Sequence, residues 1–421
     1  MRIAIISDIH FGNAECSLSN ADGSLNEITF KKFTDAVFKL SGSHKLDYLV
    51  LNGDILDFAV CSFQKSIKNA RYFFEAIEKS ELCTDIIYNP GNHDKFIWDS
   101  YEWEQTIINQ MKNQEDPLPF KRNAPGFIDM TKENSILEVY KPDDSNGCNW
   151  LKIASDQNSQ LGDIFLKGLL PKGSKMKMNL VYPNLFLNTE QGTIFVTHGQ
   201  FLQTMWQLIS EIISGYKDKK IKINETLNLQ EIEAFNYPIT QLVGSSLGQA
   251  EAVTNLAQAI QNEVEDHDKY SVTRTVNHVA PRLFNLYNKN WFIKIIYRLF
   301  QNFITREIIS FIVGTNDNSS KKYLQSLNNI DVMSRFRRFY DASVDQMQRI
   351  KPSFKNPEHF IFGHTHEAHP TPFIPKSNSI LPENLKLYNS GGWLENSNKS
   401  KVKSAVVFYI DSSGKIEHEM I

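Results

Sequence analysis

Residues 3–10 have the sequence IAIISDIH, an apolar run that ends in polar side chains. Residues 3–7 are rich in β-branched residues and too few for a helix, so they predict a buried strand. Asp8 and His10 follow at once. Because residues two apart in an extended chain point to the same side, both side chains are expected to face one site. The stretch therefore predicts a strand that delivers a carboxylate and an imidazole together.

The same pattern of an apolar run followed by polar residues recurs along the chain. Strands are predicted at residues 48–51, 86–88, 193–197 and 360–362, and the polar clusters after them read GDILD (53–57), GNHD (91–94), HG (198–199) and GHTH (363–366). Apolar spacing predicts helices over 28–40 and 67–77, between the first three strands. Runs at 385–389 and 404–410 are expected to complete the sheet. The fold class is therefore α/β, with a ligand crevice at the carboxyl ends of strands.

Residues 200–355 differ, because they show long helical periodicity and few strand signals. We expect a first domain formed by 1–199 and 356–421, interrupted by a large, mostly helical insertion over 200–355. Within it, residues 291–313 are apolar nearly all round, apart from a narrow stripe that includes Lys294 and Arg298. Such a helix usually packs inside protein. A face in contact with lipid is the alternative.

Composition excludes several classes of protein. The 421 residues include 45 Lys and Arg, 48 Asp and Glu and 41% hydrophobic residues, with a net charge of −3. This balance is globular and gives no overall basic field for nucleic acid. The four cysteines form no CxxC pair, which argues against a zinc ribbon or a disulfide scaffold. Because neither a signal-peptide core nor a spanning segment is found, a cytoplasmic protein is predicted.

The polar clusters contain carboxylates, imidazoles and one amide oxygen that could bind divalent ions. These ligand types suit Mn²⁺, Fe²⁺ or Zn²⁺ better than a thiolate site would. The candidates are Asp8, His10, Asp54, Asn92, His198, His364 and His366. Seven ligands exceed the needs of one four-coordinate ion, whereas two ions about 3.5 to 4 Å apart would use them all if one carboxylate bridged. Two divalent metal ions are therefore expected.

This ordered set of motifs resembles the calcineurin-like metallophosphoesterases, whose pattern is DxH, GDxxD, GNHD/E, GH and GHxH. The resemblance implies a β-sandwich flanked by helices, and two ions, Mn²⁺ being the first expectation and Fe or Zn the alternatives. It implies that one ion is held by Asp8, His10, Asp54 and His366, and the other by Asp54, Asn92, His198 and His364. It also implies that His93 protonates the leaving group and that Asp57 orients its imidazole.

Such a centre would hydrolyse a phosphodiester, diphosphate or phosphomonoester bond, with hydroxide formed at the ions as the nucleophile. Asn92 could ligate through its amide oxygen and donate from its NH₂ group to a phosphoryl oxygen, so it is also a candidate substrate-binding residue. Gly53, Gly91 and Gly363 are interpreted as turn residues. Asp94 is interpreted as a cap of the next turn.

The position of the insertion is similar to that of the helical lid in bacterial UDP-2,3-diacylglucosamine hydrolases. This chain differs in having His93 where those enzymes have Arg, and in its longer insertion. The expected partner is a small or lipid-linked phosphoester, with peripheral membrane contact through the insertion as a further option. A roof over the metals could be formed by the insertion's aromatic residues, Trp206, Trp291, Phe292, Phe300, Phe303 and Phe311.

Two other classes of function compete. The first is a nuclease resembling the DNA double-strand-break repair exonucleases. It would need a basic groove, and the chain offers only Lys217, Lys219, Lys220 and Lys222, and Arg335, Arg337 and Arg338. The second is a non-catalytic scaffold with the same fold. No ligand position is lost here, which argues against it, and nucleic acid is not an expected partner.

Overall fold

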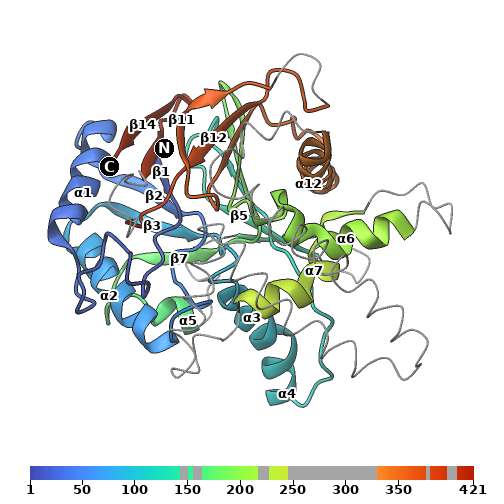
Figure 1. Cartoon of the computed structure of the whole chain (residues 1–421), viewed down its shortest axis with the longest axis horizontal. Coiled ribbons are helices and arrows are strands. Elements are labelled where there is room, and N and C mark those ends of the chain that lie inside the picture. Colours follow the sequence, from blue (N-terminus) through green and yellow to red (C-terminus); the bar gives the residue numbers. More distant parts are fainter. Residues whose placement is uncertain (143–149, 155–163, 217–226, 245–329, 376–379, 396–404) are drawn as a thin grey trace, which may run out of the picture.

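The fold is built from two β-sheets and flanking helices (Figure 1). The computed structural model describes residues 1–142, 150–154, 164–216, 227–244, 330–375, 380–395 and 405–421. The strands are β1 (Ile3–Ile6), β2 (Leu46–Leu51), β3 (Cys83–Tyr88), β4 (Gly126–Asp129), β5 (Glu138–Pro142), β6 (Trp150–Ala154), β7 (Lys177–Leu180), β8 (Asn184–Thr189), β9 (Gly192–Thr197), β10 (His359–Phe362), β11 (Ala368–Phe373), β12 (Lys386–Ser390), β13 (Val406–Ile410) and β14 (Ile416–Met420). The helices are α1 (Glu27–Ser41), α2 (Phe63–Lys79), α3 (Phe96–Trp103), the π-helical turn η1 (Glu104–Ile108), α4 (Asn109–Lys112), α5 (Ile164–Lys167), the 3₁₀ turn η2 (Gln200–Leu202), α6 (Thr204–Tyr216), α7 (Leu229–Gly244) and α12 (Ile330–Ile350).

The first sheet has the order β14-β13-β1-β2-β3-β7. Strands β1, β2, β3 and β7 are parallel, and α1 and α2 cross over between them. Helix α1 begins where the Asn26 side chain accepts from the backbone N–H of Thr29, and ends at Gly42 in a left-handed conformation. Ser62 caps α2 in the same way. These local signals explain why the two predicted helices form where they do.

The second sheet has the order β11-β12-β10-β9-β8-β4-β5-β6. Its central strands alternate strictly: Ile194 and Val196 of β9 pack in the core shared with the first sheet, whereas Phe195 between them packs on the opposite face. Burial of both faces explains why these strands read as continuous apolar runs. The two sheets with their shared core form the predicted sandwich.

The C-terminal strands correct one expectation. The runs at 385–389 and 404–410 were expected to complete one sheet, but β12 joins the second sheet beside β10, whereas β13 joins the first beside β1. The reason is the sandwich itself, because neighbouring runs of chain can enter opposite layers. The end of the described chain therefore ties the two sheets together.

Helix α12 covers the outer face of the second sheet. Phe336 and Phe339 pack against the phenylalanines of β9 and β10, with the ring of Phe336 centred 4.8 Å from that of Phe360. Asn184 of β8 donates to Ser343 at 3.0 Å. The division of the chain at residues 200 and 355 stays a prediction, and within that segment α12 is a layer of the sandwich fold.

Several calls on the insertion lie outside the described residues. They are the apolar stretch 291–313 with its basic stripe, the aromatic residues from Trp291 to Phe311, and the lysines at 217–222. Among the residues that the structure does describe, no helix is both long enough and apolar enough to cross a bilayer.

Candidate metal centre

The polar loops after β1, β2, β3, β9 and β10 converge at one edge of the sandwich. The loops after β1 and β2 are joined by backbone hydrogen bonds, from Asp8 N to Gly53 O at 2.9 Å and from His10 N to Asp54 O at 2.9 Å. Gly363 N donates to His198 O at 2.9 Å, which joins the loops after β10 and β9. The carboxyl ends of strands from both sheets thus supply one site.

Five of the seven predicted ligands have a left-handed backbone conformation. They are Asp8, His10, Asp54, His364 and His366, with φ between 53° and 66°. Strand alternation was expected to align the DxH and HxH pairs, but each pair lies beyond its strand and is aimed by two left-handed residues. A left-handed conformation at a residue other than glycine destabilises the fold by about 1 to 3 kcal/mol. Such residues are found mostly at functional sites, where the strained geometry is needed.

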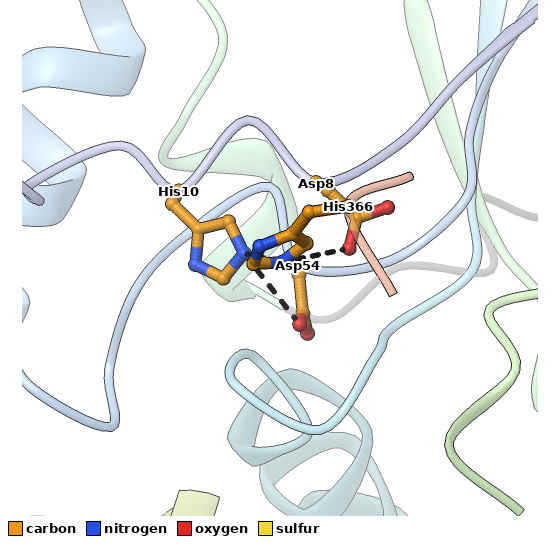
Figure 2. A group of neighbouring side chains, drawn as sticks. All are labelled: Asp8, His10, Asp54 and His366. Carbon is orange, nitrogen blue, oxygen red and sulfur yellow. Dashed lines mark hydrogen bonds and ion pairs between the residues drawn. The ribbon is translucent and has the colours of Figure 1, made fainter. Parts of the chain in front are cut away.

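Asp8, His10, Asp54 and His366 point toward one another (Figure 2). The Nε2 atoms of His10 and His366 are 3.1 Å apart, and Nε2 of His366 is 3.4 Å from Oδ1 of Asp8. Nδ1 of His10 faces Oδ2 of Asp57 at 3.2 Å, so the proton belongs on Nδ1 and Nε2 offers a lone pair to the cluster. The four side chains match the first predicted ligand set.

The second cluster contains Asp54, Asn92, His198 and His364. Nε2 of His198 lies 3.2 Å from Oδ2 of Asp54 and 3.1 Å from Oδ1 of Asn92. Nδ1 of His198 is 3.0 Å from the carbonyl oxygen of Asn52, which can only accept, so Nδ1 carries a proton. His364 joins Asp54 and His198 within ligand distance of a common point. These side chains match the second predicted set.

Two buried atoms in this cluster have no hydrogen-bond partner among the described residues. They are Oδ2 of Asp54 and Nδ1 of His364. Nε2 of His364 faces Oε1 of Gln203 at 2.9 Å, which places its proton on Nε2 and leaves Nδ1 as a lone pair. A carboxylate oxygen, an amide oxygen and imidazole lone pairs therefore converge without donors. This is the arrangement that a divalent cation fits.

The electrostatics of the cluster also call for positive charge. Burial lowers the pKa of His198, but Asp54 and Asp8 outweigh it and raise the pKa to about 9. Burial, with His198 nearby, lowers the pKa of His364 to about 3. Burial raises the pKa of Asp54, but the surrounding imidazoles hold it well below its usual value. The two buried carboxylates thus favour positive charge at this position, which a divalent cation would supply.

His93 and Asp57 lie beside these clusters. Nδ1 of His93 is 2.9 Å from Oδ1 of Asp57. The other oxygen of this carboxylate, Oδ2, accepts a hydrogen bond from Nδ2 of Asn13 at 3.0 Å. Although burial raises the pKa of Asp57, His93 and His10 hold it well below its usual value. The backbone N–H of His93 donates to Oδ1 of Asp54 at 2.8 Å. The structure therefore brings together all nine residues that the sequence singled out.

Asp94 departs from its interpretation as a cap. The residue before α3 makes no side-chain cap bond. The carboxylate of Asp94 instead accepts from backbone N–H groups of Gly91 at 2.6 Å and Ile55 at 2.8 Å, and from the hydroxyl of Tyr88 at 2.6 Å. It therefore fixes the loop that carries Asp54. The GNHD motif placed it beside the site, but nothing in the sequence indicated this role.

The glycines of the motifs are needed mainly for space. Gly53 has the positive φ of a turn residue, 88°. Gly91 and Gly363 do not, but a Cβ at Gly91 would overlap Asp54 and one at Gly363 would overlap Asp8 and Ser7. The turn interpretation is thus correct for Gly53 and incomplete for the other two.

Two residues outside the predicted ligand sets contact them. Gln203, just before α6, holds His364, and no motif marks it. Ser390 lies 2.6 Å from Ser7, which contacts Asp8 in turn. The loop at 388–393 is therefore beside the site. Trp393 within it is buried against Phe33 with ring centres 5.7 Å apart, so it packs in the core.

Comparison with protein families identifies the fold. A family model described as calcineurin-like phosphoesterase matches residues 1–223. The chain belongs to the calcineurin-like phosphoesterases. A comparison with curated proteins found no match. The matched part of this phosphoesterase contains the motif residues from Asp8 to His198, whereas His364 and His366 lie beyond it and are placed by β10. Family and side-chain clusters together support a metal-binding phosphoester hydrolase.

Proposed function

We propose that this phosphoesterase uses two divalent ions, Mn²⁺ first among them, to hydrolyse a phosphodiester, diphosphate or phosphomonoester bond of a small or lipid-linked substrate. The observation that supports it best is that two groups of carboxylate and imidazole side chains share Asp54, while Oδ2 of Asp54 and Nδ1 of His364 have no hydrogen-bond partner among the described residues. When bound, the ions supply the nucleophile from water and neutralise phosphoryl charge. Asp8, His10, Asp54 and His366 would hold one ion, and Asp54, Asn92, His198 and His364 the other.

The chain's own residues would then manage the substrate and its leaving group. Asn92 directs its oxygen at His198 and the metal cluster, which leaves its NH₂ group to donate to a phosphoryl oxygen. Asp57 holds the proton of His93 on Nδ1, so Nε2 is the atom that reaches a substrate. Protonated there, His93 would deliver a proton to the departing oxygen, a contribution of about 10² to 10⁴ in rate.

We propose a small or lipid-linked substrate in preference to DNA. Three of the basic residues named above are described. Arg335 lies 3.8 Å from Glu211 and Arg337 2.6 Å from Asp341, so these two are neutralised locally, and Nη1 of Arg338 is buried. Trp206 of α6 lies beside His364, with ring centres 6.2 Å apart. An aromatic side chain from the helical segment at the metal cluster supports a role for that segment in holding the substrate.

The test is hydrolysis of bis(p-nitrophenyl) phosphate with added Mn²⁺, together with the metal content of the purified protein. The unaltered protein should bind two ions per chain and should hydrolyse bis(p-nitrophenyl) phosphate. Asp54→Asn should lose most of both, because the shared charge is removed while the shape is kept. Asp116→Asn, an exposed acid, serves as the control. Full activity in Asp54→Asn, or one ion in the active unaltered protein, would contradict the dinuclear proposal.

A further inference from the structure

A buried charged cluster lies next to the candidate metal centre. It is formed by Lys95, Asp99 and Glu102 at α3, Arg122 in the loop before β4, and Glu233 and Tyr237 of α7. It joins the centre along the chain, because Lys95 follows His93 by two residues. The Nζ atom of Lys95 lies 5.7 Å from the centre of the Tyr182 ring. The cluster therefore continues from the side of the site that His93 occupies.

The two cations of the cluster are already engaged. Lys95 pairs with Asp99, which also accepts a hydrogen bond from Gln241 of α7. Arg122 lies 3.6 Å from Glu102 and places its guanidinium 3.9 Å from the centre of the Tyr237 ring. Lys95 lies over the same ring at 4.7 Å. Tyr237 thus holds both cations in place.

Glu233 is the member of the cluster whose carboxylate oxygens lack hydrogen bonds. Its side chain is 4% exposed, and neither carboxylate oxygen has a hydrogen-bond partner among the described residues. Oε2 of Glu102 accepts no hydrogen bond but forms the 3.6 Å ion pair with Arg122, and Oε1 accepts from the backbone N–H groups of Lys121 and Arg122. Burial raises the pKa of Glu233 well above its usual value, with Lys95 and Arg122 opposing the rise. Buried acceptors left this way are costly unless a ligand supplies donors.

The arrangement selects among ligand chemistries. A second anion would add negative charge beside Glu233 and Glu102, and an alkyl group would leave both oxygens of Glu233 without a partner. An ammonium group would add positive charge beside Lys95 and Arg122. Uncharged hydroxyl groups satisfy every condition, because a hydroxyl can donate to a carboxylate oxygen, can accept from a protonated carboxyl and adds no charge.

We propose that Glu233 and Glu102 bind the hydroxyl groups of a sugar or polyol carried on the leaving-group side of the phosphoester. The inference rests on the proposed function, because His93 identifies which side of the phosphorus this cluster adjoins. Glu233 then determines which alcohol departs and takes no part in the chemistry at phosphorus. The substrate class is narrowed to phosphoesters of a hydroxyl-rich group.

The experiment compares ligands that compete with bis(p-nitrophenyl) phosphate. Glucose 1-phosphate and cyclohexyl phosphate share a six-membered ring and differ in hydroxyls, and 2-aminoethyl phosphate against ethyl phosphate tests an amine. In the unaltered protein, glucose 1-phosphate should inhibit at about tenfold lower concentration than cyclohexyl phosphate. Glu233→Gln should bring that ratio close to one. Glu133→Gln, an exposed acid, should keep it.

Equal inhibition by the two ring phosphates in the unaltered protein would overturn the proposal without any variant, and so would a stronger preference for the amine. If the unaltered protein does not hydrolyse the reporter, the proposed function fails. Calorimetric binding of the same four ligands to the Mn²⁺-loaded protein still decides the hydroxyl preference in that case. If correctly folded Glu233→Gln still favours glucose 1-phosphate over cyclohexyl phosphate as strongly as the unaltered protein does, Glu233 does not bind the hydroxyl groups.

Discussion

Nδ1 of His93 lies 2.9 Å from Oδ1 of Asp57, and both side chains are buried. An imidazole held this way has a fixed orientation and a fixed tautomer, with its other nitrogen turned away from the carboxylate. Asp57 also faces His10 at 3.2 Å, so one carboxylate positions the candidate acid and a candidate metal ligand together. The two functions of the site are therefore coupled through Asp57.

The first prediction concerns the leaving group. His93→Ala should reduce kcat/KM for an alkyl phosphodiester by about 10² to 10⁴, and for bis(p-nitrophenyl) phosphate by far less, because nitrophenolate departs without a proton. Steady-state kinetics with both substrates measure the difference. His44→Ala, at an exposed histidine, is the control. Equal losses on both substrates would remove the acid role from His93.

The second prediction concerns the hydroxyl of Tyr88. Tyr88→Phe removes the 2.6 Å hydrogen bond to buried Asp94, and bonds to a charged acceptor are worth about 1.5 to 3 kcal/mol. We expect the free energy of unfolding to fall by roughly that amount and metal affinity to fall with it, because Asp94 fixes the loop of Asp54. Denaturant titration and metal titration measure the two effects. Tyr72→Phe, on an exposed ring, should change neither.

The third prediction concerns the space beside Asp8. In Gly363→Ala the new Cβ would overlap the carboxylate of Asp8 and the hydroxyl of Ser7, so Asp8 must move. We expect loss of at least one bound ion, measured by elemental analysis of the purified variant. Gly215→Ala, where a Cβ meets nothing within 4 Å, should retain full metal content. Full occupancy in Gly363→Ala would show that Asp8 is not held where the structure places it.

The fourth prediction concerns pH and His359, which lies outside the metal centre. Burial, aided by Lys386, lowers its pKa from 6.5 to about 4, so the fold favours the neutral ring. Its contribution to stability is complete above pH 6.5 and is lost as the pH falls through 6.5 toward 4, because the unfolded chain takes up the proton first.

His359→Gln should therefore lose less stability than the unaltered protein over this interval, by roughly 1 to 2 kcal/mol. Urea titrations at a series of pH values measure the difference. The same comparison with His44→Gln should give parallel curves, because that ring is exposed in the fold. Parallel curves for His359→Gln would show that the ring is protonated equally in the folded and unfolded chains.

Much of the fold followed from local pattern. The runs around β1, β2, β3, β9 and β10 were predicted because each is buried on both faces and ends at a polar cluster. The layer of each strand was not predictable, because β12 and β13 follow one another along the chain and enter different sheets. The spacing of apolar residues indicates that a strand is buried, but it does not indicate which strand lies beside it in a sheet.

The candidate site followed from motif spacing for a related reason. Asp8, Asp54 and His364 were found because each follows a strand end, yet the left-handed backbone that aims them has no signature in non-glycine residues. Gln203 and Tyr88 could not be found, because they act through contacts made only after folding. Glu233 was hidden for the same reason, since Lys95, Glu102 and Arg122 are more than 100 positions away in the chain.

Strand β13 lies between β1 and β14 in the first sheet, although about 400 residues of chain separate β1 from β13. A ribosome must therefore translate nearly all the described residues before β1 acquires its second neighbour. His364 and His366 emerge in the same late interval. Until then the nascent chain carries Asp8 and His10 beside an open sheet edge, which is a surface for chaperones or premature aggregation. The speed of translation through residues 200–355 thus sets how long that exposed interval lasts.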